Sequence, residues 1–106
     1  MSDIAAKLLL GEEDFITRAE MREHHVVVDE PTDEGGSDKG ARPTELLAAS
    51  LGSCTAITLR MYAKHKGWDF GDIVVDVKVE DADSCKIFHC EIQLSNEIDD
   101  DQLKRA

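Results

Sequence analysis

The feature that most constrains the fold of this chain is a helical segment without charges. No charged residue occurs between Glu45 and Arg60, and leucine, alanine and other uncharged residues fill the segment. Pro43 suits the first position of a helix, Glu45 complements the positive end of the helix dipole, and Gly67 provides the stop. A helix without charge on any face is enclosed on all sides. We therefore expect this helix to be wrapped by the chain's own sheet and by a second subunit.

The segment that follows the helix predicts a β-hairpin. Apolar and polar residues alternate from Ile73 to Glu80, which is the period of a half-buried strand. A turn-like segment, 81–84, separates this strand from a second one. The residues that the second strand directs to one apolar face are Phe88, Cys90, Ile92 and Leu94. Two strands joined in this way pair with each other, so the pattern predicts an antiparallel sheet around the helix.

Another hairpin is predicted before the helix. The segment Phe15-Ile16 and the run Val26–Val28 have the composition of strands, and the polar segment Arg18–His25 is expected to connect them. Residues 29–40 are rich in Asp, Glu, Gly, Ser and Pro, which supply turns and bury no apolar area. We expect a surface loop there.

The length of the chain suits one domain. A chain of 106 residues can build a single core, and the predicted strands and helix amount to one α+β domain over residues 1–106. Near the end, Asp99 and Gln102 have the spacing of a capping box, which predicts the start of a further helix. Fewer than two turns fit before Ala106, and so short a helix is marginal. We expect the chain to stop inside a longer C-terminal helix.

The charge balance excludes several partners. The chain has 12 Lys and Arg against 23 Asp and Glu, a formal net charge of −11. Nucleic acids and anionic membranes attract clustered basic residues, so neither is an expected partner. The longest uncharged run, Leu46–Leu59, is shorter than the roughly 20 residues that a membrane-spanning helix needs. The N-terminus lacks the pattern of a signal peptide. These features predict a soluble, cytoplasmic protein.

Cys54, within the uncharged helix, is the residue best suited to carry chemistry. The chain has three cysteines, an odd number without a CxxC motif, which fits reduced thiols better than a disulfide framework. Small residues surround Cys54, with Gly52 and Ser53 before it and Thr55 after it, where a plain core would place Leu or Ile. They leave space for a substrate. A helical cysteine can also be a small buried apolar residue and nothing more.

Neither a metal site nor a cofactor site is expected. The histidines are adjacent or scattered, without the ligand spacing of a zinc site. They are His24, His25, His65 and His89. The pair Gly35-Gly36 lacks the lysine and the helix entry of a phosphate-binding loop. We expect it to be a flexible connection.

One run of residues is similar to a known family. The segment Gly40–Ala56, GARPTELLAASLGSCTA, resembles the signature of the OsmC/Ohr superfamily, which reads Pro-x-Glu-Leu-Leu, small residues, then Gly-Ser-Cys. The resemblance continues through 66–68 and the strand 73–79, and residues 27–31 with Gly35-Gly36 also look like the family. It implies an α+β, OsmC-like fold in which two chains intertwine as a homodimer, with the central helices buried between curved sheets.

The resemblance also implies an activity. Members of the family reduce organic hydroperoxides with a helical cysteine, which attacks as a thiolate and becomes a sulfenic acid; Cys54 stands at this position. The family lowers the pKa of its thiol with an Arg held by a Glu. In the peroxide-reducing branches that Glu follows Pro directly, where this chain has Thr44, so Glu45 matches a less characterised branch. Glu45 also fits a first-turn acid that only stabilises the helix. The candidate arginines are Arg18, Arg22 and Arg42.

In the family, a second cysteine condenses with the sulfenic acid to a disulfide, and this chain departs from the family at that cysteine as well. The family places it in a Cys-Pro-x-His motif on the C-terminal helix, and this chain ends before that motif. Cys90 could replace it or simply pack in the core, and Cys85 is incidental. Without a second thiol, Cys54 would depend on an external thiol reductant. Two alternatives stay open: a non-catalytic module that binds a small hydrophobic ligand, and an inactive dimeric fragment of the same fold.

Overall fold

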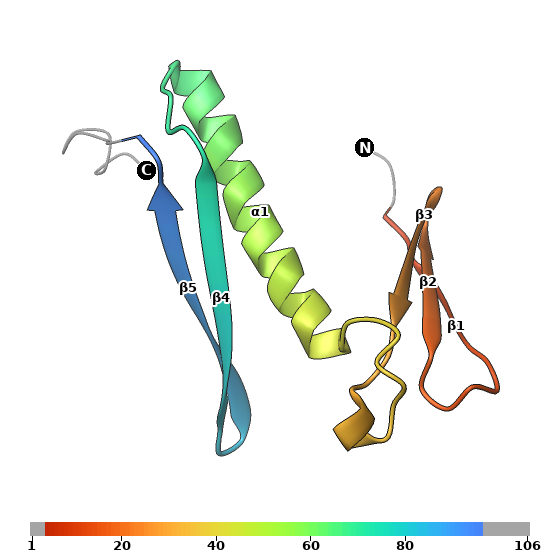
Figure 1. Ribbon diagram of the computed structural model, residues 1–106. Coiled ribbons are helices and arrows are strands. Elements are labelled where there is room, and N and C mark those ends of the chain that lie inside the picture. Colours follow the sequence, from red (N-terminus) through yellow and green to blue (C-terminus); the bar gives the residue numbers. More distant parts are fainter. Residues whose placement is uncertain (1–3, 97–106) are drawn as a thin grey trace. The chain divides into compact units, whose positions relative to one another are not determined.

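The computed structural model describes residues 4–96 of the chain. The chain divides into two compact units, Met1–Leu46 and Leu47–Ala106, and the division falls in the first turn of the helix. The first unit contains a three-stranded sheet, and the second contains most of the helix and a two-stranded sheet (Figure 1). Antiparallel sheets and a helix confirm the α+β class, whereas the number of domains stays a prediction. The helix predicted from Asp99 lies outside the described residues.

The sheet of the first unit is antiparallel, in the order β1-β2-β3. Its strands are β1 (Lys7–Leu10), β2 (Thr17–Met21) and β3 (His24–Val28). Residues 18–25, expected to connect two strands, belong mostly to the strands themselves, and the reversal occurs at Arg22, which has a φ of 59°. That expectation is wrong because Ala19 is the one buried residue of β2 and its neighbours are mostly polar. The sequence pattern also does not predict β1.

The carboxylate of Asp29 organises the loop between β3 and the helix. Asp29 is buried and accepts hydrogen bonds from the backbone N–H groups of Glu30 (2.7 Å), Ser37 (3.1 Å) and Lys39 (3.1 Å). Burial by itself would raise the pKa of Asp29, but these three donors and the charge of Lys39 bring that pKa below its ordinary value of 3.8. One side chain therefore replaces a hydrophobic core in this loop.

The glycine pair in this loop has a structural role. Gly35 ends the short 3-10 helix η1 (Thr32–Glu34) with a φ of 93°, a conformation that favours glycine. A Cβ on Gly36 would collide with the carbonyl oxygen of Glu30. The expectation that this pair is only a flexible connection is therefore wrong, because the backbone folds tightly around Asp29 at this point.

The helix α1 (Pro43–Lys66) has the bounds that its flanking residues predict. After its last turn, Gly67 has a φ of 73°. The N–H of Trp68 donates to the carbonyl of Ala63 at 2.8 Å, and the N–H of Gly67 donates to the carbonyl of Lys64 at 3.3 Å. This pair of bonds is a Schellman ending, which satisfies carbonyls that the helix leaves without partners.

The second sheet is the predicted hairpin of β4 (Ile73–Ala82) and β5 (Cys85–Leu94). Only Asp83 and Ser84 lie between the two strands. The register places apolar residues opposite each other: Val75 and Ile92, Val77 and Cys90, Val79 and Phe88. Opposite residues of an antiparallel pair share a face, so the predicted apolar face of this sheet is confirmed.

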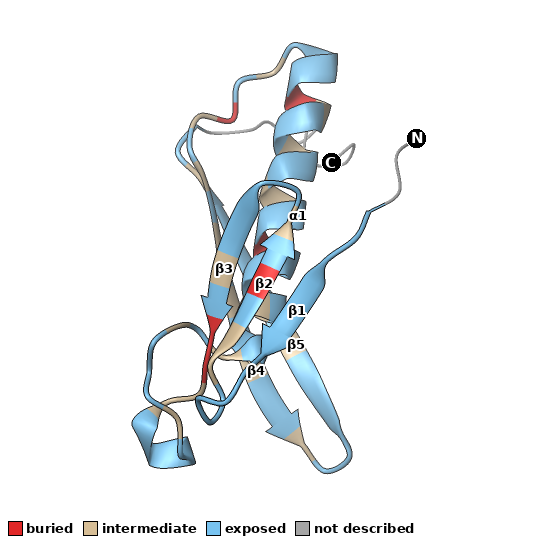
Figure 2. Cartoon of the chain, turned by 90° about the vertical axis from the view of Figure 1, so that its right-hand side faces the viewer, coloured by how far each residue is buried: buried red, intermediate tan, exposed pale blue. Residues whose placement is uncertain are grey.

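Within the unit Leu47–Ala106, α1 is covered on one side only. Its buried residues are Gly52 and Ala63, and most of its surface is exposed (Figure 2). The chain's own two-stranded sheet covers one helix face, and the predicted cover of the remaining surface by a second subunit stays a prediction. By length and composition alone, α1 is apolar enough to cross a membrane, a test that core helices of soluble proteins also pass. The length of α1 therefore does not argue against a membrane span, and the expectation of a soluble protein stays a prediction.

The Asp29 contacts give the first testable prediction. The substitution Asp29→Asn removes the charge and turns an amide NH₂ toward backbone donors, so we expect it to lower the melting temperature by several degrees. The difference should depend on pH. Because folding lowers the pKa of Asp29, the stabilisation is complete above about pH 4 and is lost as the pH falls through the folded-state pKa.

Thermal unfolding followed by circular dichroism between pH 7 and pH 2.5 measures this effect. The control is Asp33→Asn, which makes the same change of charge in the same loop, at an exposed residue. We expect the control to shift the melting temperature little at any pH. A difference between wild type and Asp29→Asn that does not shrink in acid would contradict the prediction.

Candidate active site around Cys54

Cys54 lies on the face of α1 that points away from the sheet. Gly52, two residues earlier, is buried against β4: a Cβ built on it would lie 3.2 Å from Cγ2 of Val77. Two residues turn an α-helix by about 200°, so the side chain of Cys54 points away from β4. The thiol is free and exposed. The single chain therefore leaves Cys54 exposed, and its predicted burial against a second subunit stays a prediction.

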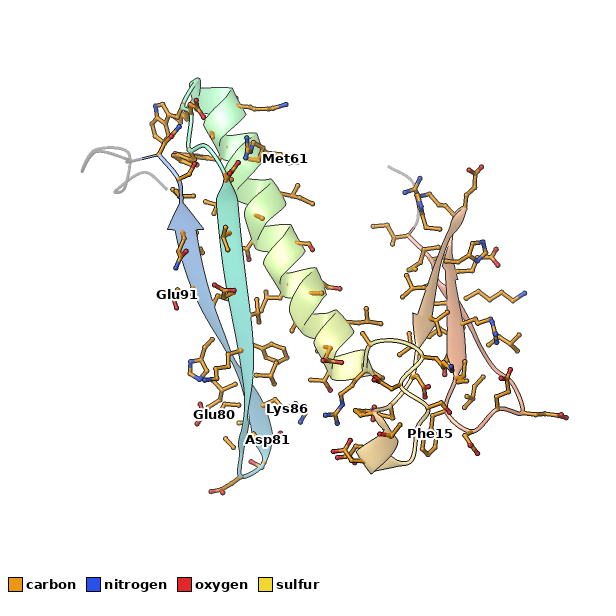
Figure 3. The ribbon with its side chains drawn as sticks, viewed as in Figure 1. Phe15, Met61, Glu80, Asp81, Lys86 and Glu91 are labelled. Atoms are coloured by element: carbon orange, nitrogen blue, oxygen red, sulfur yellow. The ribbon has the colours of Figure 1, made fainter. Side chains whose placement is uncertain are left out.

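An apolar stripe surrounds Cys54 on this outer face. Its large residues lie three or seven positions from Cys54, spacings that share one helix face. They are Leu47 (57% exposed), Leu51 (39%), Ile57 (55%) and Met61 (66%). Met61 projects from α1 in Figure 3. We call these four residues together with Cys54 the outer stripe; it is uncharged and largely open in one chain.

Glu45 stabilises the beginning of α1. Its Oε1 accepts a hydrogen bond from the backbone N–H of Arg42 at 2.8 Å, the return bond of a capping box. Nε of Arg42 lies 3.7 Å from Oε1 of Glu30 and has no hydrogen-bond partner among residues 4–96. This geometry agrees with Glu45 as an acid of the first turn. Its predicted part in holding an arginine side chain stays a prediction.

The three candidate arginines belong to the unit Met1–Leu46, whereas Cys54 belongs to the other unit. Arg18, on β2, lies 3.9 Å from Glu13 in an exposed ion pair. Arg22 occupies the β2–β3 turn, and Arg42 precedes α1. Arg18 and Arg42 pair with acidic residues of this same unit, Glu13 and Glu30. An arginine that activates Cys54 stays a prediction.

Cys90 and Cys54 lie on opposite sides of α1. Cys90 is opposite Val77 in the ladder and so shares the face that β4 turns toward Gly52. Cys54 is on the far side of the helix. Cys90 is exposed, and so is Cys85 at the end of the hairpin. The geometry gives no support for a disulfide between Cys54 and Cys90 within one chain.

The hairpin carries polar side-chain pairs on both of its faces. Nε2 of His89 lies 2.7 Å from Oε2 of Glu80, and Lys86 pairs with Asp81 near the hairpin turn (Figure 3). A shallow hollow on this hairpin is lined by Asp76, Lys78, His89, Cys90 and Glu91. Between residues 4 and 96, the His, Cys, Asp and Glu side chains do not form a group of three that could hold a metal ion. The hollow does not include the outer stripe.

Gly52 is a residue whose importance the sequence reading missed. The sequence shows it only as one of several small neighbours of Cys54, whereas the structure shows it at a close approach of α1 to β4. A signal for this was available. Glycine in a helix interior lowers helix stability, so a glycine in the middle of an uncharged helix indicates a packing requirement.

Comparison with known proteins agrees with the resemblance in the signature. Residues 36–106 match the family of OsmC-like proteins. No curated protein sequence matches the chain. The structure is similar to that of a protein described as a response protein for osmotic stress and detoxification from Psychrobacter arcticus, with a TM-score of 0.82, 24% identity, and coverage of 99% of this chain and 80% of that one.

A second similar structure is an organic hydroperoxide resistance protein, OsmC, from Legionella pneumophila. Its TM-score is 0.64 at 15% identity, over 99% of this chain and 79% of that one. At these identities the two structures show a shared fold. The family match covers more than half of the chain and contains all of α1 with Cys54. The chain belongs to the family of OsmC-like proteins.

Proposed function

We propose that this chain is a thiol redox protein that reduces organic hydroperoxides through Cys54. The observation that carries the proposal is an exposed thiol in the middle of an uncharged helix face, inside the region that matches the family. A protein of similar fold is described as an organic hydroperoxide resistance protein, which supports the same class of substrate. The apolar outer stripe suits the organic group of such a substrate.

The proposed reaction has two stages. The thiolate of Cys54 attacks the terminal oxygen of the hydroperoxide, the O–O bond breaks, and the alkoxide leaves and takes up a proton to become an alcohol. Cys54 is then a sulfenic acid. A thiol of an external reductant condenses with this sulfenic acid, which gives a mixed disulfide and releases water. A second thiol of the reductant then attacks the mixed disulfide, so Cys54 is released as a thiol and the reductant leaves as a disulfide.

An external reductant fits the arrangement of the cysteines. Cys90 shares the sheet face on the other side of α1, and Cys85 lies at the end of the hairpin. Neither supports direct condensation with Cys54. The free thiols also suit a reducing compartment, so the proposal includes a cytoplasmic protein.

In this proposal Glu45 stabilises the start of α1. Its bond to the N–H of Arg42 fixes the first turn of the helix that carries Cys54. Among the candidate arginines, Arg42 is the one that Glu45 holds by its backbone. An arginine near a thiol favours the thiolate, which is the nucleophilic form.

A double variant, Cys85→Ser with Cys90→Ser, tests the reaction with Cys54 as the remaining thiol. On addition of cumene hydroperoxide we expect stoichiometric loss of the thiol, an equal amount of cumyl alcohol, and a dimedone adduct on Cys54 detected by mass spectrometry. The matched control adds Cys54→Ser to the same background and should consume no hydroperoxide. An intact Cys54 thiol together with unchanged hydroperoxide would rule the function out.

The proposal also includes a homodimer in which a second copy covers the outer stripe. Full burial of a large aliphatic side chain contributes about 1.5–3 kcal/mol, and this face exposes several of them. A chain of this size gains much from such burial, because small domains bury a limited share of their surface alone.

The substitution Leu51→Lys tests the dimer. A lysine buried in an apolar interface costs several kcal/mol, so we expect the dissociation constant of the dimer to rise by about 100-fold or more. Analytical ultracentrifugation over a concentration series measures it. Gln93→Lys, on the polar face of β5, is the control and should leave the constant unchanged. A wild-type chain that stays monomeric at high concentration, or a Leu51→Lys chain that dimerises normally, would contradict the prediction.

A non-catalytic binding module is the second candidate, and the open apolar stripe favours it. In that case a hydrophobic ligand would bind with equal affinity to wild type and to Cys54→Ser, and hydroperoxide would leave the thiol intact. The double variant with Cys54 intact and its control with Cys54→Ser therefore also separate a binding module from a peroxidase.

A further inference from the structure

We infer that Gly52 is a positioning residue. It lets α1 approach β4 closely, and the distance between this helix and this strand sets the position of the thiol of Cys54 in the folded chain. This inference rests on the proposed function, because it concerns the thiol that the function uses. Gly52 and Ala63 are the buried residues of α1 in the described part of the chain. Of these, Gly52 lies two residues from Cys54.

The contact at Gly52 leaves little room. A Cβ on Gly52 would lie 3.2 Å from Cγ2 of Val77 and 3.8 Å from Cγ1 of Val75, with the carbonyl oxygen of Val75 at 3.9 Å. A methyl group at 3.2 Å requires its neighbour to yield by a few tenths of an ångström. Glycine therefore permits a helix-to-strand distance that larger side chains would increase.

Val77 is poorly able to yield. Its β-branched side chain has restricted χ1 rotation, and its backbone is fixed in the ladder opposite Cys90. Crowding at Gly52 would therefore move the helix away from β4 rather than move the strand. Gly52 and Cys54 lie within one turn of the same helix, so a shift at one carries the other with it.

Displacement of the thiol matters more than the loss of packing alone. A misplacement of about 1 Å between an attacking atom and its substrate can lower a reaction rate by about 100-fold, and a shift of α1 moves the thiol relative to every substrate contact that lies outside this helix. A residue that acted only on stability would lower the melting temperature without changing the rate of the folded protein. The two readouts therefore separate positioning from packing.

The experiment uses the full chain with Cys85→Ser and Cys90→Ser, in which Cys54 is the remaining thiol. Gly52→Ala and Gly52→Val are made in this background, each with and without Val77→Ala, which removes the atom nearest to the added Cβ. The rate constant for cumene hydroperoxide, the melting temperature and crystal structures are compared. Ala63→Val is the matched control, since it crowds the other buried position of α1.

We expect Gly52→Val to lower the rate constant by about tenfold or more, and Gly52→Ala by less. Adding Val77→Ala should restore the rate constant of each glycine variant to within about threefold of the rate constant of Val77→Ala alone. Such a restoration indicates a direct contact between the two positions. Ala63→Val should leave the rate constant within about threefold of that of the parent background, even where it lowers the melting temperature as much as the Gly52 variants do. If Gly52→Val does not fold, Gly52→Ala with its rescue decides the question.

A rate loss that Val77→Ala does not restore, or that Ala63→Val reproduces, would overturn the inference and leave the proposed function intact. The crystal structures give an independent outcome. In Gly52→Val the distance from Cα of Cys54 to Cα of Val77 should grow by roughly half an ångström or more and return with Val77→Ala. If the parent protein does not react with hydroperoxide, the proposed function fails, and this displacement alone still decides whether Gly52 positions Cys54.

Discussion

The structure depends on one constraint, which is that the hairpin of the unit Leu47–Ala106 covers only one side of the uncharged helix. The hairpin β4–β5 contacts α1 near Gly52, and most of the helix stays exposed. Apolar surface on this scale lowers the free energy of the folded chain only when something covers it. The contact between Gly52 and Val77 therefore decides which helix face stays uncovered, and Cys54 lies on that face.

Local polar contacts, more than a large core, fix how the chain enters the helix. The carboxylate of Asp29 gathers three backbone N–H groups, and Glu45 then bonds to the N–H of Arg42. Each contact satisfies backbone donors that would otherwise lose hydrogen bonds on folding. The buried apolar residues of the first unit, Ala19 and Val28, are small. The order of this unit thus comes from hydrogen bonding around one buried carboxylate.

The parts of the fold with local signals could be predicted from the sequence, and the others could not. Pro43 and Gly67 mark the ends of α1, and the alternation from Ile73 marks β4, because capping and side-chain period act over a few residues. The strand β2 has no such signal, since Ala19 is its one buried residue. The signature predicts Cys54 as the reactive thiol, but the side on which the thiol points follows from the contact between Gly52 and Val77, which joins residues far apart in the sequence.

The outer stripe combines two properties that the proposed dimer and the proposed thiol chemistry need. Its long side chains, such as Leu51 and Met61, offer apolar area to a second copy. The residues four positions before and after Cys54 on the same face are Ser50 and Thr58, which are short. In the proposed dimer, a partner that packs on the long side chains would therefore leave space directly above and below the thiol. A flat apolar surface would close over Cys54, whereas this pattern would allow cover and access together, so the proposed dimer and the proposed thiol chemistry would use the same helix face without competing for it.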